Sequence, residues 1–456
     1  MDEINLFPDQ RECINGIRQS IKRGNRSVLL QAGTGSGKTY MASEIVSGAF
    51  RKGKRCLFVV PRRELLRQTS STFSRFGIDH SFIAAGLPYN QFARIYIASK
   101  DTLVRRISGA FDVTVIDECH YGGAGVDKIV QHYRKGGILI GLSATPWDMA
   151  GRGMAHQYED MVQGRSIDWL IRNKRLSEYK AFAPDHVDLS GIRHSGGEYN
   201  SEQVSDRMRS AKIFGNAARH YKQHATGMRG VTFLPSVKES ERMAQLYRDC
   251  GVPAAHMDGN TPDDERKRIS VAFARRELLQ ICNAELLTFG YDLAAASGID
   301  ACVEVVSDCQ PTRSLAKQMQ KWGRGLRYDG RLHMFFDHAN NFDTHGLPRD
   351  HREWTLEPRE KRGGGNKEAS MPVRECSKCF YCHRPAPVCP NCGYEYPYQG
   401  RTVEEVEAEL KEVESRNKRV EVGRAKTLSD LRKIAQERGY KPQWVWRIAK
   451  AKGIKE

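Results

Sequence analysis

Short apolar runs alternate with stretches of helical periodicity through most of the chain. Each run is rich in Val, Ile and Leu and is bounded by polar or glycine-containing turns, which is typical of strands buried on both faces of a parallel sheet. Two successive groups of such runs predict two α/β lobes. The expected strands are Ser27–Gln31, Cys56–Val60, Ser81–Ala85, Arg94–Ala98, Val113–Ile116 and Ile138–Leu142 in the first lobe, and Val231–Leu234, Ala254–Met257, Leu278–Cys282, Ala301–Val306 and His333–Phe336 in the second.

Changes of composition divide the chain further. Helix-capping patterns at Thr402–Glu405 and Thr427–Asp430, with Gly439 and Pro442 after the second, predict a helical tail. Two roles are open for the tail helices. They either bind nucleic acid or a partner protein, or they pack as a cap on the cysteine-rich module that precedes them. The expected parts are a first lobe over 1–178, a second lobe over 179–357, a glycine-rich linker over 358–371, a cysteine-rich module over 372–400 and a basic tail over 401–456.

The first candidate site follows the first predicted strand. A glycine-rich loop between a strand and a helix points several backbone N–H groups at one place, where a polyphosphate such as that of ATP binds. Lys38 is placed to reach the β- and γ-phosphates, and Thr39 to hold Mg²⁺. The alternative is a glycine-rich turn with a surface lysine. The loop consists of Ala32, Gly33, Thr34, Gly35, Ser36, Gly37, Lys38 and Thr39.

The second candidate site is a pair of carboxylates after the strand Val113–Ile116. Open α/β sheets bind ligands at the carboxyl ends of their strands. We expect Asp117 to hold Mg²⁺ and Glu118 to orient and deprotonate the water that attacks the γ-phosphate. The alternative is the ordinary polar end of a strand.

Two further stretches complete a pattern. Ser143–Pro146 follows another buried strand, and Gln320–Arg327 lies far downstream. With the loop and the Asp-Glu-Cys-His stretch, they resemble the DExH branch of the superfamily 2 helicases and translocases, over roughly residues 1–345. The resemblance implies two tandem RecA-like lobes that hydrolyse ATP, with Arg324 and Arg327 acting on the nucleotide from the second lobe.

Weaker matches to the same family fill the gaps. The resemblance implies that Gln10 recognises adenine and that Pro61–Leu66 and Ile97–Leu103 contact the nucleic-acid backbone. Asp292 matches a segment that couples the nucleotide state to the grip on the strand and belongs to the nucleotide site. In that segment the family's glutamate and proline are missing and the loop is longer, which puts efficient coupling in doubt.

Charge and cysteine usage add to this picture. The formal net charge is +17, which favours a polyanionic partner. We expect no membrane contact, because no apolar run approaches the length of a membrane span. The N-terminus does not have the pattern of a signal peptide, and most cysteines are scattered, so we expect a reducing, cytoplasmic location in a bacterium or a phage-infected host.

Four cysteines form two C-x-x-C pairs that are typical of a Zn²⁺ site. Cys382 and His383 lie between the pairs, so either could replace a ligand. Tyrosines in the same module either stack on bases or pack a small core. The expected ligands are Cys376, Cys379, Cys389 and Cys392, and the tyrosines are Tyr381, Tyr394, Tyr396 and Tyr398.

The complete layout resembles the RadD-like branch of bacterial and bacteriophage DNA helicases. We therefore predict a nucleic-acid-stimulated ATPase that moves on or unwinds DNA, single-stranded or branched, in repair, recombination or replication. The tail is a possible contact for a protein partner. The alternatives are an RNA helicase, or a zinc-containing nucleic-acid-binding protein with a degenerate ATPase.

Overall fold

The computed structural model describes most of the chain, which divides into two compact units, Met1–Tyr396 and Pro397–Glu456. The predicted linker residues 359–371, the predicted helix start at 402–405 and Tyr398 lie outside the described residues. The described residues are 4–107, 109–184, 187–195, 198–288, 290–358, 373–397, 425, 427–437, 439–440, 442–452 and 454.

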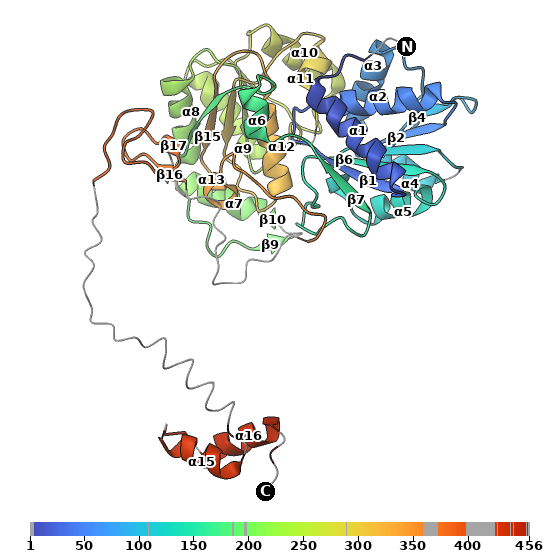
Figure 1. Cartoon of the computed structure of the whole chain (residues 1–456). Coiled ribbons are helices and arrows are strands. Elements are labelled where there is room, and N and C mark those ends of the chain that lie inside the picture. The colour runs from blue at the N-terminus through green and yellow to red at the C-terminus, as the bar shows by residue number, and fades with distance from the viewer. Residues whose placement is uncertain are drawn as a thin grey trace. The chain divides into compact units, whose positions relative to one another are not determined.

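The first sheet has seven parallel strands in the order β3-β4-β2-β5-β6-β1-β7 (Figure 1). The six predicted strands are present, with ends that differ by up to two residues. An edge strand, β7, extends the sheet beyond the prediction. The strands are β1 (Ser27–Gln31), β2 (Cys56–Val60), β3 (Ser81–Ile83), β4 (Ile95–Ser99), β5 (Val113–Ile116), β6 (Ile138–Ser143) and β7 (Asp160–Gln163).

The second sheet has six parallel strands in the order β12-β13-β11-β14-β15-β8. Its edge strand β8 was not predicted, and β14 begins four residues later than expected. The strands are β8 (Tyr179–Phe182), β11 (Gly230–Phe233), β12 (Ala254–His256), β13 (Gln280–Asn283), β14 (Val305–Asp308) and β15 (His333–Asp337), and a separate hairpin pairs β9 (His194–Ser195) with β10 (Glu198–Tyr199).

Helices cover both faces of each sheet, so each lobe has two apolar layers (Figure 1). In the first lobe, α1 (Pro8–Lys22), α2 (Lys38–Arg51) and α3 (Glu64–Arg75) cover one face, and α4 (Lys100–Arg105) and α5 (Ala124–Tyr133) cover the other. In the second lobe the helices are α6 (Ile167–Arg172), α7 (Ser201–Ser210), α8 (Ile213–His224), α9 (Val237–Asp249), α10 (Asp263–Ala274), α11 (Leu293–Ser297), α12 (Leu315–Arg324) and α13 (Asn341–His345). This doubly wound arrangement confirms the predicted fold class of two RecA-like lobes.

The cysteine-rich segment is attached to the edge of the second sheet. It contains the small hairpin of β16 (Arg374–Glu375) and β17 (Cys382–His383). Beside the hairpin, Phe182 of β8 forms an antiparallel bridge with Tyr381, and the Ala183 N–H donates to the Phe380 carbonyl at 3.0 Å. The segment therefore belongs to the same compact unit as the two lobes.

The two lobes contact each other through the helix α12. A Cβ atom built at Gly323 of α12 would lie 2.2 Å from the Thr34 side chain of the first lobe. A Cβ at Gly290 would lie 2.9 Å from Leu65 of α3. At Gly323, therefore, the absence of a side chain is what allows the second lobe to approach the glycine-rich loop.

Gly323→Ala is expected to separate α12 from the glycine-rich loop, because the added methyl group overlaps Thr34. Such overpacking costs about 1–3 kcal/mol. Hydrogen–deuterium exchange should increase in the loop and in α12. Gly215→Ala in α8 is the matched control, since a Cβ there meets nothing within 4 Å. Exchange in Gly323→Ala equal to that of the wild type would contradict this contact.

Candidate nucleotide site and metal centre

The two predicted sites of the first lobe lie at one edge of its sheet. Strand β1 leads into the glycine-rich loop and β5 leads into Asp117, and β6 lies between these two strands. Because all three strands are parallel, their carboxyl ends place the loop and the two carboxylates close together. The first lobe thus brings together the residues that the sequence analysis assigned to phosphate and metal.

The glycine-rich loop has the backbone conformation of an anion-binding cradle. Gly35 and Gly37 have φ angles of +86° and +83°, in the left-handed region that favours glycine. The Thr34 and Ser36 hydroxyl oxygens are buried and have no hydrogen-bond partner among the described residues. Buried hydroxyls without partners are rare, so their presence beside these backbone turns fits a polar ligand such as a polyphosphate.

Lys38 occupies the hollow of this loop. Its side chain is buried, and its ammonium donates to the Ala32 carbonyl at 3.2 Å and lies 3.9 Å from the Glu118 carboxylate. A buried ammonium needs partners of opposite charge. In this position Lys38 can exchange the Ala32 carbonyl for a phosphate oxygen without leaving Glu118.

The two carboxylates have opposite protonation tendencies. Burial, together with the neighbouring Glu118 charge, raises the pKa of Asp117 to about 7. Burial also disfavours the charged form of Glu118, but the Lys38 ammonium and the Gln320 amide outweigh it and hold its pKa below the usual value. Asp117 therefore needs a nearby cation to stay ionised, as a magnesium ligand would, while Glu118 is already an available base.

A hydrogen bond connects the carboxylate segment to the next strand. The His120 ring lies 2.9 Å from the Ser143 hydroxyl at the end of β6, and burial lowers the pKa of His120 to about 4. The imidazole is therefore neutral near pH 7. Glu118 itself has a φ of +44°, a left-handed conformation that is uncommon outside glycine. The short link between His120 and Ser143 helps to hold this part of the backbone in place.

The second lobe contributes the polar face of α12. Gln320 donates to the Glu118 carboxylate at 3.0 Å, and Arg324, one turn later, donates to the Tyr291 carbonyl at 2.9 Å. Arg327 forms an ion pair with Asp292 at 2.7 Å. Thr34, Gly35, Arg324, Arg327 and Asp292 all line one cavity between the lobes.

The structure brings some of the predicted site residues together and leaves the roles of others as predictions. Lys38, Glu118 and the loop come together, and both arginines line the adjacent cavity. The Gln10 amide donates to the Ser36 carbonyl at 2.9 Å, so it supports the loop, and its contact with adenine stays a prediction. Likewise the Asp292 carboxylate holds Arg327 and caps α11, and its place in the nucleotide site stays a prediction.

Two contacts at the site were not predicted. Gln320 had no assigned role, although its spacing of four residues from Arg324 places both side chains on one face of a helix. The Arg175 guanidinium lies over the Phe7 ring, 3.4 Å from its centroid, beside the Gln10 segment. Arg175 follows α6, and nothing in its local sequence indicates this partner.

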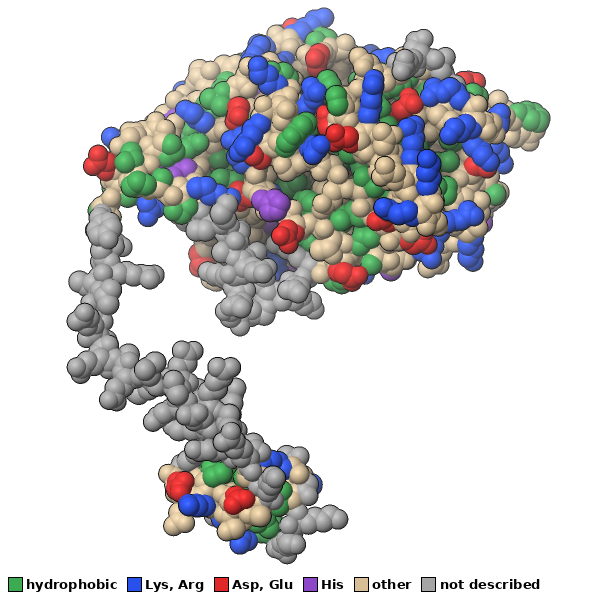
Figure 2. Space-filling model, viewed as in Figure 1, with side chains coloured by type: hydrophobic (Ala, Val, Ile, Leu, Met, Phe, Trp, Pro, Cys, Tyr) green, Lys and Arg blue, Asp and Glu red, His purple; other side chains and the backbone are tan. Residues whose placement is uncertain are grey.

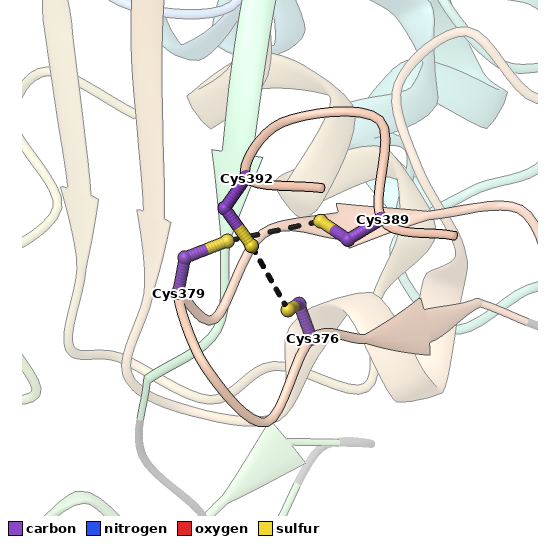
Figure 3. Close-up of side chains that lie close together, drawn as sticks. All are labelled: Cys376, Cys379, Cys389 and Cys392. Atoms are coloured by element: carbon purple, nitrogen blue, oxygen red, sulfur yellow. Dashed lines mark hydrogen bonds between the residues drawn. The ribbon is translucent and has the colours of Figure 1, made fainter. Parts of the chain in front are cut away.

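The four predicted cysteine ligands converge in the second candidate site (Figure 3). The Sγ atoms of Cys376 and Cys392 are 3.6 Å apart, and those of Cys379 and Cys389 are 3.8 Å apart. Tetrahedral zinc with Zn–S bonds of about 2.3 Å requires sulfur atoms about 3.8 Å apart. The set of four thiols is therefore compatible with a tetrahedral metal ion.

The two alternative ligands point elsewhere. The Cys382 side chain belongs to the apolar core of the second lobe, and both His383 ring nitrogens have partners, the Arg384 carbonyl and the Tyr396 hydroxyl. Tyr396 also packs against Tyr394 and under the Arg374 guanidinium. The described tyrosines thus take part in the internal packing of the module.

Comparisons with known proteins identify a family match and relatives of similar sequence. Residues 3–148 match the family described as type III restriction enzyme, res subunit. The chain is 29% identical over 420 residues to the 51.5 kDa protein of a Lactococcus phage (isolate 7-9), covering 90% of this chain and 88% of the phage protein.

Two longer proteins match more distantly. The putative ATP-dependent helicase IRC3 of Saccharomyces cerevisiae is 25% identical, covering 74% of this chain and 51% of the yeast protein. The EcoAI endonuclease subunit, a type I restriction enzyme subunit of Escherichia coli, is 27% identical, covering 71% of this chain and 44% of the subunit. The chain thus spans about half the length of these two relatives.

A solved structure of another enzyme aligns with most of the chain. The ATP-dependent type ISP restriction-modification enzyme LlaBIII bound to DNA aligns with 74% of this chain and 28% of its own chain, with a TM-score of 0.55 and 14% identity. At this identity the likeness shows the fold, a pair of RecA-like lobes. The chain is thus similar to restriction enzyme subunits and to a putative ATP-dependent helicase, and it shares the fold of two RecA-like lobes.

Proposed function

We propose that the protein is an ATP-dependent DNA helicase or translocase of the RadD-like branch, acting in DNA repair, recombination or replication. The observation that carries the proposal is the hydrogen bond between Gln320 and Glu118, at 3.0 Å, from opposite lobes. It joins the carboxylate assigned to water activation to the helix that bears Arg324. Hydrolysis in this arrangement depends on the position of the second lobe, which is what an ATP-driven motor requires.

The residues of the first lobe bind and activate the reactants. The loop N–H groups and Lys38 hold the phosphates of ATP, and Thr39 and Asp117 hold Mg²⁺. When bound, Mg²⁺ neutralises charge on the β- and γ-phosphate oxygens. Glu118 orients the attacking water and accepts its proton, because Lys38 keeps this carboxylate ionised.

The residues of the second lobe complete the site on closure. Negative charge on the γ-phosphoryl oxygens must be stabilised in the transition state, and Arg324 and Arg327 line the cavity that opens onto the loop. Arg327 is oriented by Asp292. On closure Gln320 also holds the Glu118 carboxylate in place through its hydrogen bond. Hydrolysis therefore requires the two lobes to be in contact.

DNA is favoured as the polymer by the family match and by the relative that is a restriction enzyme subunit. The net charge of +17 suits either nucleic acid, and Figure 2 shows Lys and Arg side chains spread over both lobes on the face in view. Single-stranded or branched DNA is the proposed substrate. An RNA helicase is the second candidate, and the complete set of contacts from Lys38 to Arg324 speaks against a degenerate ATPase.

The four thiols are proposed to hold one Zn²⁺, which ties the module together. Asn391 donates to the Cys379 sulfur at 3.5 Å and accepts from Lys180 of β8 at 2.8 Å. A ligand is thereby oriented by a side chain of the second lobe, as is usual for the outer partners of metal ligands.

Glu118→Gln is expected to lower the ATPase turnover by about 10²-fold or more, because the amide keeps the shape of the side chain but cannot accept a proton. The affinity for a non-hydrolysable ATP analogue should stay within about twofold, since the phosphate loop is unchanged. Glu44→Gln is the control, because this carboxylate pairs with Arg51 within α2 and has no assigned role at the site. A turnover near that of the wild type would refute the assignment of Glu118.

Arg324→Ala should lower the DNA-stimulated ATPase rate by about 10³-fold, the usual contribution of an arginine finger. DNA affinity, measured by fluorescence anisotropy, should fall little because phosphate contacts dominate it. Arg327→Ala should reduce the stimulated rate as well. Arg219→Ala on the exposed side of α8 is the control. Full stimulation in both finger variants would exclude a mechanism based on lobe closure.

The purified protein should contain one zinc per chain by elemental analysis. The double variant Cys389→Ser/Cys392→Ser should lose it, because two of the four thiolates are gone. Cys382→Ala should retain it, since this thiol lies in the apolar core. Loss of zinc in Cys382→Ala with retention in the double variant would reverse the ligand assignment.

A further inference from the structure

The last part of the C-terminal unit, residues 425–456, carries about a third of the net positive charge of the protein. Residues 425–456 contain nine Lys or Arg and three Asp or Glu, a net charge of +6 within a total of +17. Their described part is a pair of helices, α15 (Leu428–Glu437) and α16 (Pro442–Lys452) (Figure 1). The ATPase mechanism above uses none of these residues.

A small apolar core determines which faces of these helices are free. Leu431 and Ala435 of α15 pack with Val445 and Ala449 of α16, each pair separated by four residues. The Lys452 ammonium donates to the Ala425 carbonyl at 2.6 Å and closes the open end of the pair. The opposite side of α16 therefore faces outward.

That outward side has an unusual composition. Gln443, Trp446, Arg447 and Lys450 are all exposed and follow the i, i+3, i+4, i+7 spacing of one helix face. Trp446 is 51% exposed. The sequence of α16 contains no acidic residue. We call these four residues the α16 stripe.

The indole in the stripe is not needed by the core. Trp444, on the inner side of α16, already packs against the Tyr440 ring with centroids 4.7 Å apart, and it contacts the core of the unit. An exposed Trp beside two cations leaves a large apolar surface in water, which in a small unit indicates a binding surface.

We propose that the α16 stripe binds single-stranded nucleic acid. An indole provides a flat face for stacking on an unpaired base, the Arg447 guanidinium and the Lys450 ammonium reach the flanking phosphates, and the Gln443 amide is suited to a base edge or a sugar. Paired bases offer no free face to an indole, so the stripe distinguishes single strands from duplex. This site lies outside the two lobes, and its binding does not require that they hydrolyse ATP.

The test uses the full chain without nucleotide and a fluorescein-labelled oligothymidine, followed by fluorescence anisotropy. Trp446→Ala should weaken binding about five- to tenfold and change binding of a blunt duplex by less than about twofold. The variant Arg447→Glu/Lys450→Glu should also weaken binding, and the slope of log affinity against log salt should fall by about 1.4. The variant Arg432→Glu/Lys433→Glu on α15 makes the same change of charge on exposed residues of the neighbouring helix and should have a clearly smaller effect.

A second measurement tests the contact directly. An oligonucleotide with 5-bromodeoxyuridine, irradiated with the wild-type protein and mapped by mass spectrometry, should crosslink to the peptide that contains Trp446. Wild-type affinity in Trp446→Ala, an equal loss in the α15 control, or crosslinks confined to the lobes would each overturn the proposal. Failure of the ATPase proposal would appear instead in the Glu118→Gln and Arg324→Ala rates, which these binding experiments do not involve.

Discussion

The contact of α12 with the glycine-rich loop is the constraint on which the site depends. Three positions of one helix, Gln320, Gly323 and Arg324, face the first lobe because they are three and four residues apart. Gly323 allows the approach, Gln320 reaches Glu118, and Arg324 enters the cavity next to Thr34. A rotation of α12 by a single residue would remove all three contacts together. These contacts of the second lobe with the nucleotide site are therefore made or lost together.

In the first lobe, charged side chains are buried just after the carboxyl ends of β1 and β5. The Lys38 ammonium lies 3.9 Å from the Glu118 carboxylate and favours its ionised form, which burial alone would disfavour. Asp117 forms no ion pair within 4 Å among the described residues, and burial together with the neighbouring Glu118 charge raises its pKa to about 7. The positive φ of Glu118 adds backbone strain at the same place. Burying the charges of Lys38, Asp117 and Glu118 disfavours folding, while the proposed chemistry requires these charged groups at the site.

Local patterns predicted much of this molecule. Eleven strands of the two sheets could be predicted because they are short, largely apolar runs. The glycine-rich loop and the group of four cysteines could be predicted because the residues of each lie close together in the sequence. The strands β7 (Asp160–Gln163) and β8 (Tyr179–Phe182) escaped prediction because both are short and mix polar with apolar residues. The contacts of Gln320 with Glu118 and of Arg175 with Phe7 depend on how large bodies pack, which no local pattern encodes.

The attachment of the cysteine-rich segment to β8 has a consequence for the behaviour of the protein in solution. An uncovered sheet edge offers unpaired N–H and C=O groups to other chains and promotes aggregation. Here the Phe380–Tyr381 backbone covers part of that edge, and the turn that carries it begins at Cys376. The grouping of the four thiols fixes this turn, and the turn shields the β8 edge of the second sheet from neighbouring molecules. Oxidation or chelation at this centre would reach beyond the module and change how chains associate with one another.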